Sequence, residues 1–206
     1  LALFAGLNAF PKKSYLSEYS SRINHQRTTQ LLASWHEQVS ATELFPSESF
    51  NLDFHSVPYC GQDPVVENHY VSARSRRQPS ILVFLAQDAG SHAFCYSNAD
   101  LRKGEESEEI FQFISFWKRT HGQIPRHLVF DSRLTTYEAL ARLDKMDISF
   151  ITLRRRSPKL LKEIVLLPPS AWRTVEQEVT LAGCKLRQLF VQDLGHDEPT
   201  ILLTNQ

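Results

Sequence analysis

The sequence has few cysteines, no net charge and no long apolar segment, and each of these absences argues against a class of protein. Its three cysteines, Cys60, Cys95 and Cys184, are odd in number and form no C-x-x-C pair. This pattern argues against a disulfide framework and against a zinc knuckle. Lysine plus arginine number 23, and aspartate plus glutamate also number 23. Because the formal net charge is zero, any contact with nucleic acid must rest on local patches.

Common catalytic and targeting motifs are missing as well. The glycine motifs of P-loop, dinucleotide-binding and serine hydrolase proteins do not occur, and the histidines show no H-x-x-x-H spacing. Residues 1–10 are apolar, but they lack a basic leader and a cleavage motif and are too few to span a bilayer. We interpret them as part of a core, and we expect a cytoplasmic protein that contacts no membrane.

The composition that is present is that of a globular protein. The 206 residues are 42% hydrophobic and 22% charged, which suits one or two packed domains. Between residues 11 and 39 apolar residues recur at helical spacings, and this predicts one or two helices. Residues 40–50 carry the proline and serine signals of a connector. We therefore expect residues 1–50 to form a helical N-terminal segment.

Three β-strands are predicted next. Residues 51–57 alternate polar and apolar and end at Pro58, as a strand with one buried face does. Residues 80–86 form the continuous apolar run of a central strand, and residues 92–97 follow it after a turn. The polar segment 59–79 is predicted to be an excursion or a hairpin. Three antiparallel strands in succession are therefore expected.

Helices and strands alternate in the following part of the chain. Apolar residues at i, i+3, i+4 and i+7 predict a helix over residues 105–120. Residues 127–130 form a buried strand with Asp131 at its carboxyl end. A second helix and a strand over residues 148–153 follow. The predicted order of the core, which we assign to residues 51–157, is β-β-β-α-β-α-β.

This order is that of the ribonuclease H-like fold, an α/β fold with a mixed five-stranded sheet and flanking helices. In that fold the first strand is central and lies beside the fourth. Asp53 on the first strand and Asp131 after the fourth are therefore expected to lie side by side. Adjacent carboxylates suit Mg²⁺ or Mn²⁺, and two such ions about 3.5–4 Å apart can assist displacement at phosphorus. The predicted chemistry is phosphodiester cleavage and strand transfer.

Each aspartate also has a structural interpretation. Asp131 could cap the next helix, although Thr135 and Glu138 form a better-placed capping box. Asp53 could be a solvent-facing polar residue of an amphipathic strand. Spacing alone leaves both interpretations open.

Four segments resemble the DDE transposases of the bacterial insertion-sequence-four-like group. They are NLDFHSVPY (51–59), LRKGE (101–105), VFDSRLTTY (129–137) and FITLRRR (150–156). The resemblance covers the chain from about residue 50 to its end. It implies that Asp53 and Asp131 are catalytic metal ligands and that residues 158–206 begin a β-rich insertion. It also implies DNA as partner, both as element ends and as target, and a homodimer in the intact enzyme.

In that family the third acidic ligand is a glutamate on a helix that follows the insertion. Nothing in this sequence matches its signature. We interpret both ends of the chain as cut, so the third ligand is expected to have been lost to truncation. The alternative is Glu163, on a predicted short helix, which would make the chain a ribonuclease H-like nuclease that cuts without rejoining.

Two arginine clusters are candidates for contacts with DNA phosphates, which need cationic donors but no particular base. They are Arg74, Arg76 and Arg77, and Arg154, Arg155 and Arg156. A solvated charged surface is the alternative for each arginine. For the whole chain, the alternative to a transposase catalytic domain is a catalytically inactive, truncated remnant that at most binds DNA or an intact transposase.

Overall fold

The computed structural model divides the chain into two compact units, Leu1–Ala41 and Thr42–Gln206. The residues it describes are 14, 15, 18, 23–39, 42–61, 65–131, 136–154, 157–165, 176–181, 183–191 and 200–206. In the first unit, α2 (His25–Val39) lies within the predicted helical segment. Asn24 caps this helix, because its side-chain oxygen accepts a hydrogen bond from the backbone nitrogen of Arg27 at 3.0 Å.

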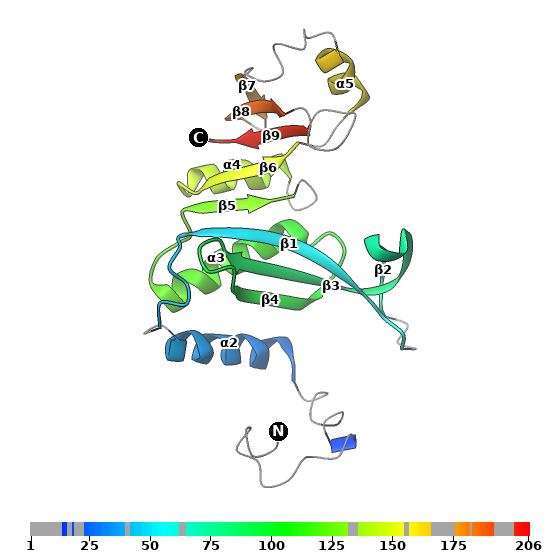
Figure 1. The fold of residues 1–206 in the computed structure, drawn as a ribbon, viewed down its shortest axis with the longest axis vertical. Helices are drawn as coiled ribbons and strands as arrows, with labels where there is room; N and C mark the ends of the chain where they lie inside the picture. Colours follow the sequence, from blue (N-terminus) through cyan, green and yellow to red (C-terminus); the bar gives the residue numbers. More distant parts are fainter. Residues whose placement is uncertain are drawn as a thin grey trace. The chain divides into compact units, whose positions relative to one another are not determined.

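The second unit contains one sheet and three α-helices among its described residues (Figure 1). Its elements in chain order are β1 (Ser49–Pro58), β2 (Asn68–Val71), η3 (Ser72–Arg74), β3 (Arg76–Asp88), β4 (Phe94–Leu101), α3 (Glu106–His121), β5 (His127–Phe130), α4 (Tyr137–Lys145), β6 (Ser149–Leu153), α5 (Pro158–Val165), β7 (Glu176–Leu181), β8 (Cys184–Val191) and β9 (Thr200–Thr204).

The centre of the sheet has the order β4-β3-β1-β5-β6. β3 is antiparallel to both β1 and β4. β5 is parallel to both β1 and β6. This is the mixed five-stranded arrangement predicted from the sequence, with the first strand of the core beside the fourth. β2, in the segment predicted as an excursion or hairpin, pairs with the start of β3.

Three more strands lengthen the sheet beyond β6 in the order β9-β8-β7, and all of them pair antiparallel. β7 was not predicted, because its sequence EQEVTL offers no apolar alternation over most of its length. α5 packs on this extension, where Leu160 and Ile164 form a buried cluster with Phe190 of β8 and Ile201 of β9.

The core lies between one face of the sheet and its helices. Phe50 of β1 packs on Phe113 and Trp117 of α3, with ring centroids 5.4 and 4.5 Å apart. Figure 1 shows α3 and α4 on the same side of the sheet. Side chains alternate along a strand, so the row that holds Asn51, Val129 and Ile151 points the other way. There Val129 and Ile151 are each 44% exposed.

α3 forms where the spacing of apolar residues predicted a helix. Ile110, Phe113, Ile114 and Trp117 form its buried stripe. Gly122 ends the helix in a left-handed conformation, with φ of 76°, and donates a hydrogen bond to the carbonyl of Lys118. The helix therefore holds its apolar stripe against β1 and stops before β5 begins.

In the described part of the chain the three cysteines form no disulfide, and they differ in exposure, which leads to a prediction. Burial, followed by the nearby Asp88 carboxylate, raises the pKa of Cys95 to about 12, whereas Cys60 is exposed. Since the thiolate is the nucleophile, we expect iodoacetamide at mildly alkaline pH to modify Cys60 and to spare Cys95 in the folded protein. Peptide mass spectrometry measures this, with the urea-unfolded chain as the control in which both react. Fast modification of Cys95 in the folded chain would contradict its burial.

Candidate active site

Asp53 in the middle of β1 and Asp131 directly after β5 lie where β1 passes the carboxyl end of β5. Leu52 pairs with Phe130, so one step further along both strands the two aspartates share a row and a face. Neighbouring strands are about 4.8 Å apart, which brings the two side chains within reach of one cation. The structure thus brings the two aspartates together, while their role as ligands stays a prediction.

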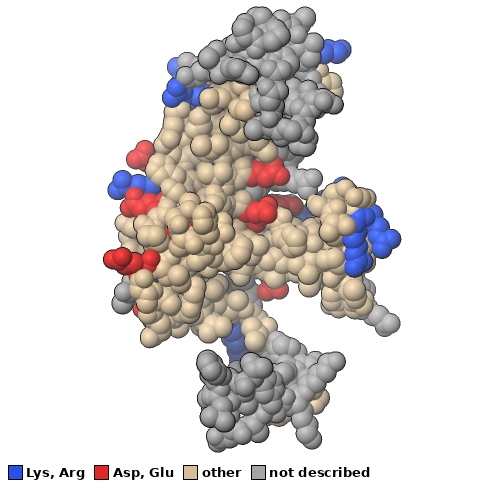
Figure 2. All heavy atoms as spheres, in the orientation of Figure 1, with Lys and Arg blue, Asp and Glu red and all other residues tan. Residues whose placement is uncertain are grey.

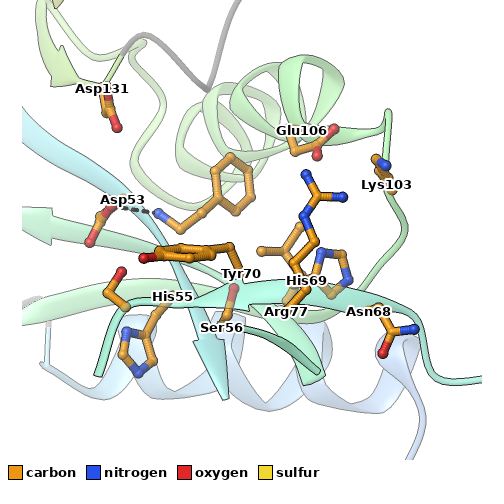
Figure 3. Close-up of a pocket in the computed structure, with 13 residues that line it drawn as sticks. Asp53, His55, Ser56, Asn68, His69, Tyr70, Arg77, Lys103, Glu106 and Asp131 are labelled. Atoms are coloured by element: carbon orange, nitrogen blue, oxygen red, sulfur yellow. Dashed lines mark hydrogen bonds between the residues drawn. The ribbon is translucent and has the colours of Figure 1, made fainter. Parts of the chain in front are cut away.

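Both aspartates line a cleft with a volume of about 1080 Å³. Its other lining residues come from β1, β2, η3 and β3, from the turn that leads into α3 and from the first residue of α3. Figure 3 shows Asp53 and Asp131 at one end of this cleft, and Arg77, Lys103 and Glu106 at the other. The cleft therefore has one end that holds two carboxylates and another end where two cations accompany one carboxylate.

Few protein groups compete for the oxygens of the two aspartates. One oxygen of Asp53 accepts a hydrogen bond from the backbone nitrogen of Phe54 at 2.8 Å. Among the described residues, Asp131 accepts no hydrogen bond and neither aspartate forms an ion pair. Adjacent unpaired carboxylates repel each other, and a divalent cation with oxygen ligands relieves that repulsion. The chemistry of this donor pair therefore fits Mg²⁺ or Mn²⁺.

Among the described residues, no third ligand lies beside the pair. The described part of the chain contains no group of three histidine, cysteine, aspartate or glutamate residues that could hold a metal ion. Glu163 lies on α5, and its side chain is outside the described residues. α5 packs on β8 and β9, and three strand spacings, about 14 Å, separate β9 from β1. The position of α5 gives no support to the interpretation in which Glu163 completes a site with Asp53.

The first arginine cluster is divided by the pairing of β2 with β3. Figure 2 shows lysines and arginines gathered over the η3 turn. Arg77 lines the cleft, whereas Arg74 and Arg76 donate to the side-chain oxygen of Gln78 at 3.5 and 3.3 Å. Consecutive residues of a strand point to opposite faces, so Arg76 and Arg77 do not serve the same surface.

The second arginine cluster follows β6. Arg154 is half-buried, and its guanidinium donates a hydrogen bond to Oε1 of Gln188 on β8. This contact ties the end of β6 to the extension of the sheet, and Arg154 is not among the residues that line the cleft. Arg155 and Arg156 lie outside the described residues. A DNA contact of these three arginines stays a prediction.

The capping box predicted for α4 is wrong. The N-cap is Thr136, whose hydroxyl accepts a hydrogen bond from the backbone nitrogen of Ala139 at 3.2 Å. A box formed by Thr135 and Glu138 would start the helix one residue earlier, and Thr135 itself lies outside the described residues. Asp131 is not the cap either, so helix capping does not account for this aspartate.

Several residues of the cleft were not predicted from the sequence, among them the polar and charged side chains of His69, Tyr70, Lys103 and Glu106. His69 and Tyr70 carry no motif, because β2 is only four residues long and pairs with the polar start of β3. Lys103 lies in the family-like segment LRKGE, and that segment was the one available signal for this end of the cleft.

No family model and no curated protein matches the sequence. Its fold is similar to that of a piggyBac transposase in a synaptic complex with hairpin DNA, with a TM-score of 0.50, 13% identity, and coverage of 78% of this chain and 33% of that chain. Human endonuclease V matches with a TM-score of 0.37, 11% identity, and coverage of 77% and 69%. An Argonaute of Marinitoga piezophila with guide RNA matches with a TM-score of 0.32, 7% identity, and coverage of 78% and 23%.

The chain spans 33% of the length of the transposase chain that it matches. At 13% identity this likeness concerns the fold. The likeness in fold is consistent with the strand order β4-β3-β1-β5-β6 of the second unit. The chain therefore has the ribonuclease H-like fold that the sequence predicted.

Proposed function

We propose that this chain is the catalytic core of a DDE transposase of the insertion-sequence-four-like group, which cuts DNA at the ends of its element and joins them to a target. The observation that carries the proposal is the parallel pairing of β1 with β5, with Asp53 and Asp131 in one cleft. The family-like segments around both aspartates and the fold shared with a transposase add support.

In this proposal the carboxylates of Asp53 and Asp131 hold Mg²⁺ or Mn²⁺. When bound, such an ion favours deprotonation of a water or 3′-hydroxyl nucleophile and stabilises the leaving oxygen. The two aspartates provide the oxygen ligands and balance the charge of the ion. Arg77 and Lys103 provide cationic donors that orient the phosphate backbone without selecting a base.

The intact protein is proposed to act as a homodimer, because two element ends must meet before they are joined. Its partners would be the DNA of the element ends and of the target, in the cytoplasm at the nucleoid. Among the described residues, no helix combines the length and apolar character needed to cross a membrane.

Metal binding tests the proposal most directly. We expect calorimetry to detect binding of Mn²⁺ or Mg²⁺ to the purified chain, and we expect Asp53→Asn and Asp131→Asn each to abolish it. The amide keeps the shape of the side chain but removes the charge that balances the cation. Asp100→Asn is the matched control, because Asp100 is an exposed aspartate of β4 outside this cleft. Binding that survives in both cleft variants would refute the shared site.

A second candidate function is DNA binding without cleavage. It is favoured by one observation: the described residues bring together two carboxylates but no third metal-binding side chain. Two-metal catalysis depends on a complete set of ligands. A wild-type chain that binds the metal and DNA but leaves a supercoiled plasmid intact would favour this candidate.

A further inference from the structure

An exposed aromatic ring lies in the cleft between the acidic pair and the cations. Tyr70 of β2 lines the cleft and is 43% exposed. In Figure 3 its ring extends from β2 toward the end where Asp53 lies, and Arg77 and Lys103 stand on the other side of it. The exposed part of this ring leaves apolar surface open to solvent, so a ligand with a flat apolar face is a suitable partner for it.

We propose that the cleft binds single-stranded DNA, with Arg77 and Lys103 on the phosphate backbone and the Tyr70 ring stacked on an unpaired base next to the Asp53–Asp131 pair. This inference rests on the proposed function and names its substrate: a strand that is unpaired at the scissile position. A base inside an intact duplex is stacked on both faces, so an aromatic side chain reaches it only after it leaves the stack. Aromatic stacking together with a cationic groove is the general mode of single-strand binding.

The β2–β3 hairpin presents the ring and one cation together. Tyr70 is directly opposite Arg77 in the antiparallel register. Side chains of paired residues project from the same face of a hairpin, with their Cβ atoms about 5 Å apart. That distance is short enough for one nucleotide to contact the ring with its base and the guanidinium with its phosphate.

The two cations are available for an external anion. Among the described residues, the side chains of Arg77 and Lys103 are exposed and form no hydrogen bond or ion pair. Arg74 and Arg76, on the same hairpin, are held by Gln78. Of the first arginine cluster, only Arg77 therefore lines the cleft. Lys103, which is distant in the sequence, provides the second cation.

The backbone at the start of α3 does not provide an additional anion site. The backbone nitrogen of Lys103 donates to a carboxylate oxygen of Glu67 at 2.8 Å, and that of Gly104 donates to Glu106 at 2.6 Å. These two donors are already occupied by carboxylates of the protein. Recognition of phosphate at this end of the cleft thus falls to the side chains of Arg77 and Lys103.

The test measures binding of the full chain to a fluorescently labelled oligothymidylate by anisotropy, without divalent cations so that no strand is cut. Tyr70→Ala is expected to weaken binding about tenfold, whereas Tyr70→Phe keeps the ring and wild-type affinity. Arg77→Ala and Lys103→Ala are each expected to lower the slope of log affinity against log salt by about 0.7. Arg76→Ala removes the same charge from the same hairpin outside the cleft and is the matched control, with an unchanged slope expected.

Three results would overturn the inference. Wild-type affinity in Tyr70→Ala would exclude stacking. Equal losses in Tyr70→Phe and Tyr70→Ala would mean that the hydroxyl, and not the ring, makes the contact. A duplex of the same length that binds more tightly than the single strand, with no effect of Tyr70→Ala, would indicate a duplex-binding surface. Thermal unfolding of each variant checks that these exposed substitutions leave the fold intact.

Failure of this inference differs from failure of the proposed function. If metal binding depends on Asp53 and Asp131 while Tyr70→Ala leaves single-strand binding unchanged, the catalytic proposal stands and the substrate inference fails. If Tyr70→Ala weakens single-strand binding but the metal does not bind, the cleft is a single-strand site without the proposed catalysis.

Discussion

The Asp53→Asn and Asp131→Asn variants are expected to cut DNA at least about 1000-fold more slowly than the wild type in the presence of Mg²⁺ or Mn²⁺. Each substitution removes one of the two negative charges that the structure brings together where β1 passes the carboxyl end of β5. Plasmid nicking under single-turnover conditions measures the rate. Because both aspartates serve one site, the double variant is expected to be no slower than either single variant.

The controls for this prediction come from the same chain. Asp100→Asn removes an exposed aspartate from β4, outside the cleft, and should leave the rate unchanged. Cleavage that persists in Asp53→Asn, or losses that simply add in the double variant, would show that the two aspartates do not share one metal site. A wild-type chain that does not nick DNA would instead favour the binding-only candidate.

The Asp88→Ala variant is expected to lose about 3 kcal/mol of unfolding free energy. Asp88 ends β3 and is 0% exposed. One carboxylate oxygen accepts hydrogen bonds from the backbone nitrogens of Gly90 and Ser91, at 2.9 and 2.7 Å, and from the hydroxyl of Ser91 at 3.1 Å. The other accepts from the backbone nitrogen of Ser47 at 3.1 Å. Alanine would leave these part-buried donors without their acceptor.

Two further substitutions sharpen the prediction for Asp88. Asp88→Asn retains one acceptor oxygen and the shape of the side chain, so its loss should be about half as large. Asp100→Ala removes an exposed aspartate and should change stability by less than about 0.5 kcal/mol. Urea denaturation followed by circular dichroism measures all three. Equal stability of Asp88→Ala and Asp100→Ala would show that the hydrogen bonds of the β3–β4 turn contribute little.

The contacts of Asp88 also connect stability to the candidate site. Ser47 lies two residues before the start of β1, and Phe50 of β1 pairs with Asp88 in the sheet. β1 carries Asp53. Loss of the Asp88 contacts at the start of β1 is therefore expected to disturb the position of Asp53 relative to Asp131 as well. The sequence predicted a turn at residues 88–90, but it contained no signal that the Asp88 carboxylate would be buried.

The elements that fill the core were predictable from local patterns. The predicted strand 127–130 has the same bounds as β5, and the predicted helix 105–120 differs from α3 by one residue at each end. Their apolar residues must be buried in any stable arrangement, so the pattern alone marks them. β2 and β7 were not predicted as strands, because their sequences are largely polar and their backbones are paired by neighbouring strands.

The sequence alone determines the order of strands and helices, the presence of an aspartate on the first strand and another after the fourth, and the zero net charge. The cleft depends on the tertiary structure. Pairing of β1 with β5 brings Asp53 to Asp131, and the β2–β3 hairpin and the start of α3 bring Tyr70, Arg77 and Lys103 to the same space. The physical reason is that the spacing of apolar residues along the sequence indicates only which side chains will be buried. Which strands become neighbours depends on the packing of the whole core, and that packing decides which distant polar residues share a site.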